Sequence, residues 1–180
     1  MRRNPTRRAA LGLALAAAGA SLAAAHTPYG QWVVYRQKHL LIGAHRGDPR
    51  TYELAQAVVT ALGDELPEAA ARVARGPRPE RIASLLATGQ LMTAVMANGE
   101  AAAMASGRPP FEAYLPVPLR QLAALGDGYG LYASPDLPED HAWLVAEALA
   151  HAGLGSAPES RELAVHPGAA TFWSGGPLPG

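Results

Sequence analysis

The chain has 180 residues, of which 15 are basic and 15 acidic, and 49% are hydrophobic. It contains no cysteine, which excludes disulfides, thiolate metal sites, a cysteine nucleophile and a bacterial lipoprotein anchor. A protein without disulfides depends on its hydrophobic core, and this composition is sufficient to build one.

The first 25 residues have the pattern of an export signal. Four arginines occur among the first eight residues, and no acidic residue precedes Ala25. The stretch Ala9–Ala25 is small and apolar and ends in three alanines, as a signal peptidase requires. Thr6–Leu11 resembles a twin-arginine export box without its usual aromatic residue, so twin-arginine and general secretory export are both open. We expect cleavage after Ala25 and a periplasmic protein, with a retained membrane anchor as the alternative.

The mature chain would be mildly acidic. Cleavage after Ala25 leaves 155 of the 180 residues, a length that fits one domain. Removing the four leader arginines from the 15 basic residues leaves 11 against 15 acidic residues, a net charge of −4. Nucleic acids are held mainly by clustered basic side chains, so this balance argues against a nucleic acid partner.

Beyond an N-terminal arm of residues 26–39, the pattern alternates between strands and helices. The expected strands are Leu40–Ile42, Ala71–Ala74, Leu91–Met96 and Tyr129–Ala133. The expected helices run from Asp48-Pro49 to Gly63, from Pro79 to Gly89, over Asn98–Gly107 and onward from Asp136. Residues 116–125 are expected to connect elements, and residues 155–180 to form a loop-rich tail that packs on the domain. The pattern predicts an α/β domain over residues 40–154, with an open, mostly parallel sheet flanked by helices.

Two loops in series lead from the end of a predicted strand to the start of a helix. The first carries Arg46, Asp48, Thr51 and Tyr52, and the second carries Arg78. In open α/β sheets ligands bind at this edge, where a helix start offers N–H groups and a partial positive charge. Arg46 and Arg78 would add charge, and Thr51 and Tyr52 would orient the ligand. The loops predict a site for a small organic anion, a carboxylate or an amino acid; solvated turn residues and helix caps are the other interpretation.

Motifs for catalysis and for common cofactors do not occur. The sequence lacks GxxxxGK[ST], GxGxxG and GxSxG, and no serine has the surroundings of a nucleophile. We therefore expect a protein that is not an enzyme and that has no cofactor.

A weaker alternative concerns copper. After cleavage, His26 would be the N-terminal residue, and a terminal amine together with its own imidazole can chelate copper. His39 or His45 is a possible third nitrogen ligand, although no HxxxH or HExxH spacing occurs.

Several segments together resemble a known family. They are Gly43–Ala57, Arg81–Gln90, Leu137–Asp140 and His166–Ala170, the last followed by Phe172-Trp173. The combination is similar to the TAXI-type solute-binding proteins of TRAP transporters, which share the type II periplasmic-binding fold. In that family a helix opening after Leu-Pro-Glu-Asp and a later His-Pro-Gly-Ala are typical of the C-terminal part.

The resemblance implies a fold and a function. Family members have two α/β lobes that close over a ligand, whereas this chain has room for a single or reduced lobe. By resemblance, ligand contacts would fall on Ala44–Tyr52 and Gly76–Arg78, on an open face. The expected function is binding of a small organic anion for a TRAP-type transporter or a sensor. The alternative is a ligand-free accessory or assembly protein of a membrane or redox complex.

Overall fold

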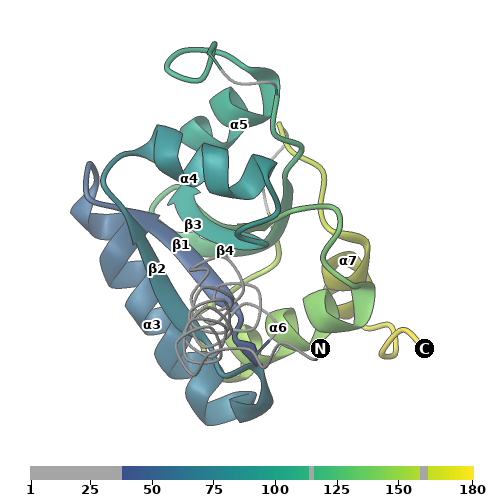
Figure 1. The fold of residues 1–180 in the computed structure, drawn as a ribbon. Coiled ribbons are helices and arrows are strands. Elements are labelled where there is room, and N and C mark those ends of the chain that lie inside the picture. Colours follow the sequence, from purple (N-terminus) through teal and green to yellow (C-terminus); the bar gives the residue numbers. More distant parts are fainter. Residues whose placement is uncertain (1–37, 114–115, 159–161) are drawn as a thin grey trace, which may run out of the picture. The chain divides into compact units, whose positions relative to one another are not determined.

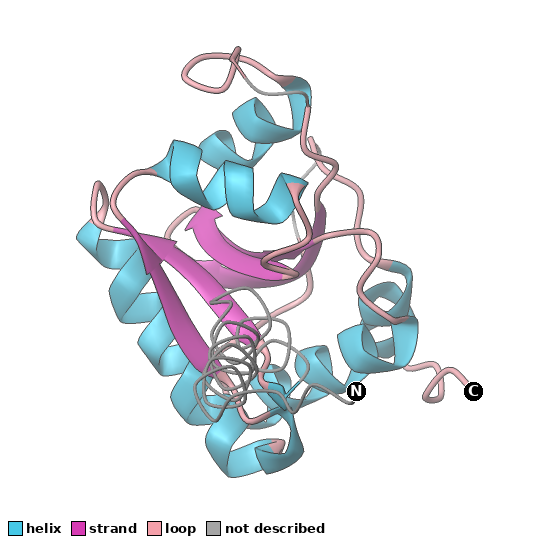
Figure 2. Ribbon diagram, in the orientation of Figure 1, coloured by secondary structure: helices cyan, strands magenta, loops and turns pink. Residues whose placement is uncertain are grey.

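A five-stranded β-sheet with helices on both faces forms the body of the domain (Figures 1 and 2). In this computed structural model, the described residues are 38–113, 116–158 and 162–180. The predicted signal peptide, residues 26–37 of the predicted arm, and His26 as a metal ligand lie outside them. Within the described ranges, no helix combines the length and the apolar character needed to cross a membrane.

The first half of the domain alternates strands and helices as predicted. Its elements are β1 (Leu41–His45), α3 (Pro49–Glu65), η1 (Pro67–Ala69), β2 (Arg72–Gly76), α4 (Pro79–Ala87) and β3 (Thr93–Ala97). β1 pairs in parallel with both β2 and β3 and lies between them. The α/β class predicted from the sequence is therefore confirmed.

The second half makes the sheet mixed. Its elements are α5 (Asn98–Ser106), β4 (Arg120–Gly126), β5 (Tyr129–Ala133), α6 (Glu139–His151) and α7 (Pro167–Trp173). Segment 116–125, expected to be a connection, contains most of β4, which pairs antiparallel with β5. Asp127 and Gly128 form the tight turn between them, and residues 126–128 all have positive φ, with values of 82°, 53° and 79°. Since β5 also runs antiparallel to β3, the order β2-β1-β3-β5-β4 contains two parallel and two antiparallel pairings instead of a mostly parallel set.

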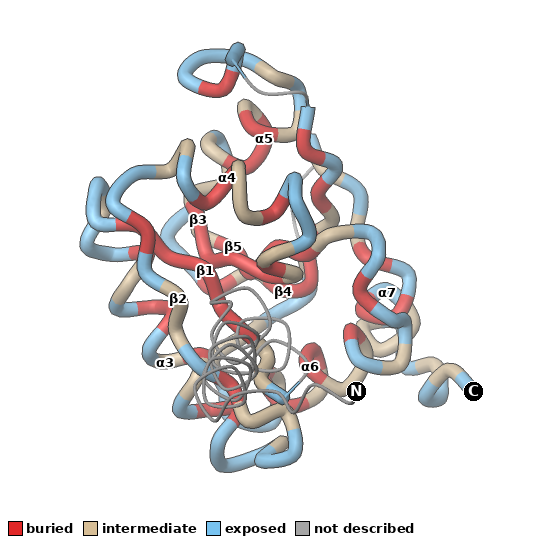
Figure 3. Tube along the Cα trace, viewed as in Figure 1, coloured by how far each residue is buried: buried red, intermediate tan, exposed pale blue. Residues whose placement is uncertain are grey.

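Alternating side chains divide the sheet between two hydrophobic cores. Ile42 and Ala44 of β1 belong to the core under α3 and α6, whereas Leu41 belongs to the core under α4 and α5. All five residues of β1 are buried (Figure 3). Because successive strand side chains point to opposite faces, His45 at the end of β1 lies on the face of α4 and α5.

Helix α3 begins as the sequence predicts. Asp48 caps it and Pro49 occupies its first turn, where the missing N–H of proline has no intrahelical role. Leu54, Val58 and Leu62, spaced by four residues, are buried in the core that α3 shares with α6.

The C-terminal tail contains a helix that was expected to be a loop. Helix α7 packs against α6 and β4, and the Trp173 indole N–H donates to the Leu122 carbonyl oxygen at 2.8 Å. Phe172 contacts Trp143 edge to face, with ring centroids 5.3 Å apart. The tail also forms single β-bridges to β4, one of which pairs Gln121 with Val165.

Gly168 allows α7 to approach α6 at backbone distance. A Cβ at this position would overlap the Glu139 carbonyl oxygen and lie 2.7 Å from the Glu139 carbonyl carbon. We predict that Gly168→Ala lowers the free energy of unfolding by about 3 kcal/mol, because the two helices must separate. Urea denaturation measures the change.

Gly63 provides the matched control. It lies within α3, and a Cβ there would meet nothing within 4 Å. Gly63→Ala should therefore raise the free energy of unfolding by about 0.5–1 kcal/mol. Equal effects of the two substitutions would show that the α6–α7 contact is not as tight as described.

Candidate functional site

The candidate site lies at the carboxyl ends of β1, β2 and β3. Each of these strands leads through a short loop, or directly, into a helix: α3, α4 and α5 respectively. The chain leaves β1 toward the face of α3 and leaves β3 toward the face of α5. Ligands of open α/β sheets bind where neighbouring connections diverge in this way. The two predicted loops therefore fall at a favourable position in the fold.

The loop from β1 to α3 is fixed by its own hydrogen bonds. The Asp48 carboxylate accepts from the Arg50 backbone N–H at 2.9 Å. The buried Thr51 hydroxyl lies 2.8 Å from the Asp48 carbonyl oxygen and 3.1 Å from the His45 carbonyl oxygen, and it accepts from the His45 N–H at 3.3 Å. Thr51, expected to orient a ligand, thus closes the loop in this structure.

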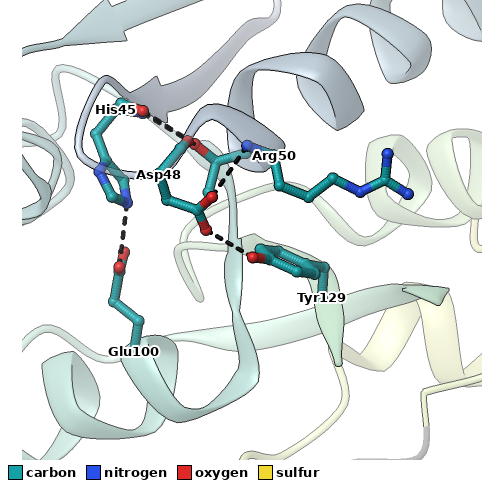
Figure 4. Close-up of polar contacts among 6 residues, drawn as sticks. His45, Asp48, Arg50, Glu100 and Tyr129 are labelled. Carbon is teal, nitrogen blue, oxygen red and sulfur yellow. Dashed lines mark hydrogen bonds and ion pairs between the residues drawn. The ribbon is translucent and has the colours of Figure 1, made fainter. Parts of the chain in front are cut away.

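A tyrosine from β5 ties the same loop to the other half of the sheet (Figure 4). The Tyr129 hydroxyl donates to the second carboxylate oxygen of Asp48 at 2.7 Å, which raises the pKa of Tyr129. The Arg50 guanidinium lies on the outside, 3.2 Å from Glu53 and 3.4 Å from Asp127. Both carboxylate oxygens of Asp48 are therefore engaged, and its predicted role as a cap is confirmed.

A histidine–glutamate contact spans β1 and the start of α5, and the sequence analysis did not predict it. His45 Nε2 lies 3.1 Å from Glu100 Oε2, and the side chains are 4% and 20% exposed (Figure 4). This hydrogen bond raises the pKa of His45 above its ordinary value of 6.5; burial opposes the shift. The carboxylates of Glu100, Asp48 and Glu80 add to it through their charge.

Three buried atoms around this contact have no hydrogen-bond partner among the described residues. They are His45 Nδ1, Glu100 Oε1 and Glu80 Oε2, the last from the first turn of α4. We call these three residues the histidine–glutamate cluster. A buried polar atom without a partner costs about 1–3 kcal/mol, and ordered water is the usual partner of such atoms.

The predicted arginines lie on the surface beside this cluster. Arg46 and Arg78 are both exposed, and neither guanidinium forms a hydrogen bond or ion pair with another described residue. The Arg46 N–H donates to the Gly76 carbonyl oxygen at 3.0 Å, which holds the first loop against the end of β2. Tyr52 is directed elsewhere, since its ring lies under the Arg75 guanidinium, 4.1 Å from ring centroid to Cζ.

The described residues do not form a metal centre. Among residues 38–113, 116–158 and 162–180, no group of three or more acidic, histidine or cysteine side chains could hold a metal ion. His39 Nδ1 lies 3.0 Å from the Ala70 carbonyl oxygen, and His45 Nε2 is bonded to Glu100. Copper binding through His26 stays a prediction.

Comparison with known proteins gives no family for the chain. No protein-family model matches it, and no curated protein sequence matches it.

The two buried histidines have pKa shifts of opposite direction. The pKa of His45 is raised mainly by its hydrogen bond to Glu100, whereas burial lowers the pKa of His166, the residue that precedes α7. Protonation of His45 therefore favours the folded state, and protonation of His166 favours the unfolded state.

We predict that His45 stabilises the fold most below about pH 6.5 and that this contribution is lost as the pH rises through its raised pKa. His45→Gln removes the titration but keeps a donor for Glu100. The free energy of unfolding should therefore differ between wild type and His45→Gln by more at about pH 5.5 than at about pH 8.5. Urea denaturation at both pH values measures it.

His166 is present in both proteins, so its own pH dependence cancels in that difference. His166→Gln should show a pH dependence of the opposite sign. Because the pKa of His166 is lowered in the folded state, the free energy of unfolding of the wild type should fall relative to that of this variant as the pH falls below about 6.5. A His45→Gln difference that is the same at both pH values would contradict the pairing of His45 with Glu100.

Proposed function

We propose that this chain is a non-catalytic, exported binding protein for a small organic anion, which it delivers to a membrane transporter or a sensor. One observation carries the proposal. Arg46 and Arg78 are exposed and unpaired among the described residues, at the edge of the sheet where α3, α4 and α5 begin. The position suits a ligand, and the guanidinium is the side chain best shaped to hold a carboxylate.

The helix starts support an anion unequally. At α3 the Asp48 side chain already accepts from a backbone N–H. At α4 and α5 the residues before the helix, Arg78 and Ala97, make no side-chain capping bond. Unpaired N–H groups and the positive end of the helix dipole attract anions. However, the Arg81 N–H of α4 and the Asn98 N–H of α5 donate to carbonyl oxygens, and each of these helices carries a glutamate in its first turn. The anionic group is therefore assigned to the guanidiniums of Arg46 and Arg78 and not to a helix start.

A single lobe limits how the ligand is held. The described domain has one sheet, and the candidate residues Arg46 and Arg78 lie on its surface. Binding proteins that enclose a ligand between two lobes bury most of the ligand's surface. An open face leaves much of that surface in contact with water. We propose that binding to the free domain is weak and that the membrane partner covers the ligand on delivery.

We predict that a panel of dicarboxylates and amino acids contains compounds that raise the melting temperature of the domain. For such a compound, Arg46→Ala and Arg78→Ala should each raise the dissociation constant about tenfold, which corresponds to about 1.4 kcal/mol. Thermal shift identifies the compound, and calorimetric titration measures the affinity.

Arg72→Ala is the matched control, because Arg72 is exposed at the first position of β2, the opposite end of that strand. It should leave the affinity unchanged. If no anion in the panel stabilises the domain, the proposal fails, and a ligand-free accessory role is favoured instead.

A further inference from the structure

We propose that the outer edge of β2 is a docking site for an extended acidic segment of a partner protein, which adds a strand to the sheet beside Arg72 and Arg75. The inference goes beyond the proposed binding of a small anion and uses different residues. Arg46 and Arg78 lie on loops at the carboxyl ends of the strands, whereas Arg72 and Arg75 belong to β2 itself.

The first step concerns the free edge. β2 is the outer strand of the sheet, and among the described residues it pairs only with β1 (Figure 1). The Arg72 N–H donates to the Leu40 carbonyl oxygen at 3.0 Å, so alternate residues of β2, counted from Arg72, direct their backbone groups toward β1. The N–H and C=O groups of Val73 and Arg75 therefore point outward, where an added strand can bond to them.

The second step concerns the two faces of this edge. Val73 packs against the core under α3 and α6, and Ala74 packs against the core under α4 and α5. Because successive side chains alternate, Arg75 lies on the face of α3 and Arg72 on the face of α4. The cation–π contact agrees, since the Arg75 Cζ lies 4.1 Å from the ring centroid of Tyr52 in α3. An added strand therefore meets one arginine on each face.

The third step concerns the charges of the arginines. Both side chains are exposed, and neither guanidinium is paired with a carboxylate of another described residue. The Arg72 guanidinium donates to the Ala71 carbonyl oxygen at 2.7 Å. That carbonyl belongs to the same peptide unit as the Arg72 N–H and points the opposite way, so the guanidinium lies along the free edge. The Arg75 guanidinium stacks on Tyr52 with its flat face, which leaves its N–H groups available to a carboxylate.

These positions define the sequence pattern of the partner segment. A residue opposite a β2 residue has its side chain on the same face of the sheet. Carboxylates opposite Arg72 and Arg75 are therefore three positions apart, and the two residues between them cover Val73 and Ala74, which are only partly buried. The pattern acidic–apolar–apolar–acidic is the same in both directions, so it fits parallel and antiparallel addition.

A second copy of this chain is a poor occupant. Its own β2 has the sequence Arg-Val-Ala-Arg-Gly, with two arginines and no acidic residue. Pairing two such edges would place like charges together, which is unfavourable. The two arginines thus oppose self-association and select an acidic strand.

Matched peptides test the pattern. The probe is a fluorescent peptide with Glu-Val-Val-Glu between glycine–serine ends. One control peptide contains Val-Glu-Glu-Val, which has the same composition and charge with the carboxylates in the wrong positions. The other is the probe N-methylated at both valines, which removes the N–H groups that an added strand donates. Fluorescence anisotropy at low ionic strength should show the probe binding on the order of tenfold more tightly than either control.

Arginine variants locate the site. Arg72→Ala and Arg75→Ala should each weaken binding of the probe on the order of tenfold. Arg108→Ala is the matched control, because Arg108 is exposed and follows α5, which packs on β3 and β5; it should leave the affinity unchanged. Melting temperatures check that each variant is folded. The comparison of the three peptides uses the unaltered protein, so it stands even if a variant does not fold.

The outcomes that would overturn the docking site are distinct. Equal binding of all three peptides would show an unspecific attraction for anions, as for an anionic membrane surface. Failure of the probe to bind would remove the acidic segment as the occupant. A dimer of the chain in sedimentation equilibrium that excludes the probe would assign the edge to a second copy. None of these results depends on Arg46 or Arg78, so the proposed binding of a small anion stands or fails separately.

Discussion

The burial of β1 on both faces is the constraint on which the rest of the domain depends. A strand covered on one side by α3 and on the other by α4 and α5 must divide its side chains between two cores, and it does so residue by residue. His45 is the last residue of that strand and takes its place in the second core by this alternation. It is therefore held out of water at the edge where three helices begin, and Glu100 is the group that makes its burial tolerable.

Much of the first half of the fold follows from local sequence. Asp48-Pro49 has the chemistry of a helix start, and the apolar spacing of α3 is unambiguous, so this helix was predictable. β4 was not predicted because its apolar run follows a proline-rich segment and lies at the edge of the sheet. The sequence Gly126-Asp127-Gly128 between two apolar runs was the available signal, since a tight turn of this kind joins antiparallel strands. Similarly, Pro167 directly after His166 marked the start of α7.

The candidate site shows where sequence reasoning stops. Position relative to a strand end led to the prediction of Arg46 and Arg78 as ligand contacts; the structure shows that both are exposed, and their role stays a prediction. It did not distinguish Thr51, whose hydroxyl closes the loop, from a residue that faces a ligand. The contact between His45 and Glu100 joins residues 55 positions apart, and only the pairing of β1 with β3 brings them together. One sequence signal for Glu100 was available. Like Glu80, it occupies the first turn of a helix that follows a parallel strand, and such positions lie at the same edge of the sheet as the end of β1.

The bridges from the tail to β4 have a consequence for solubility. The outer edge of a sheet offers unpaired N–H and C=O groups to any passing strand, and such edges lead to aggregation unless they are covered or charged. Here the two edges are treated differently. β2 carries the exposed charges of Arg72 and Arg75, whereas β4 is partly occupied by Ser156 and Val165. The segment after α6 thus serves as a cap on the sheet, and a chain shortened at that point would expose an apolar strand edge to other molecules.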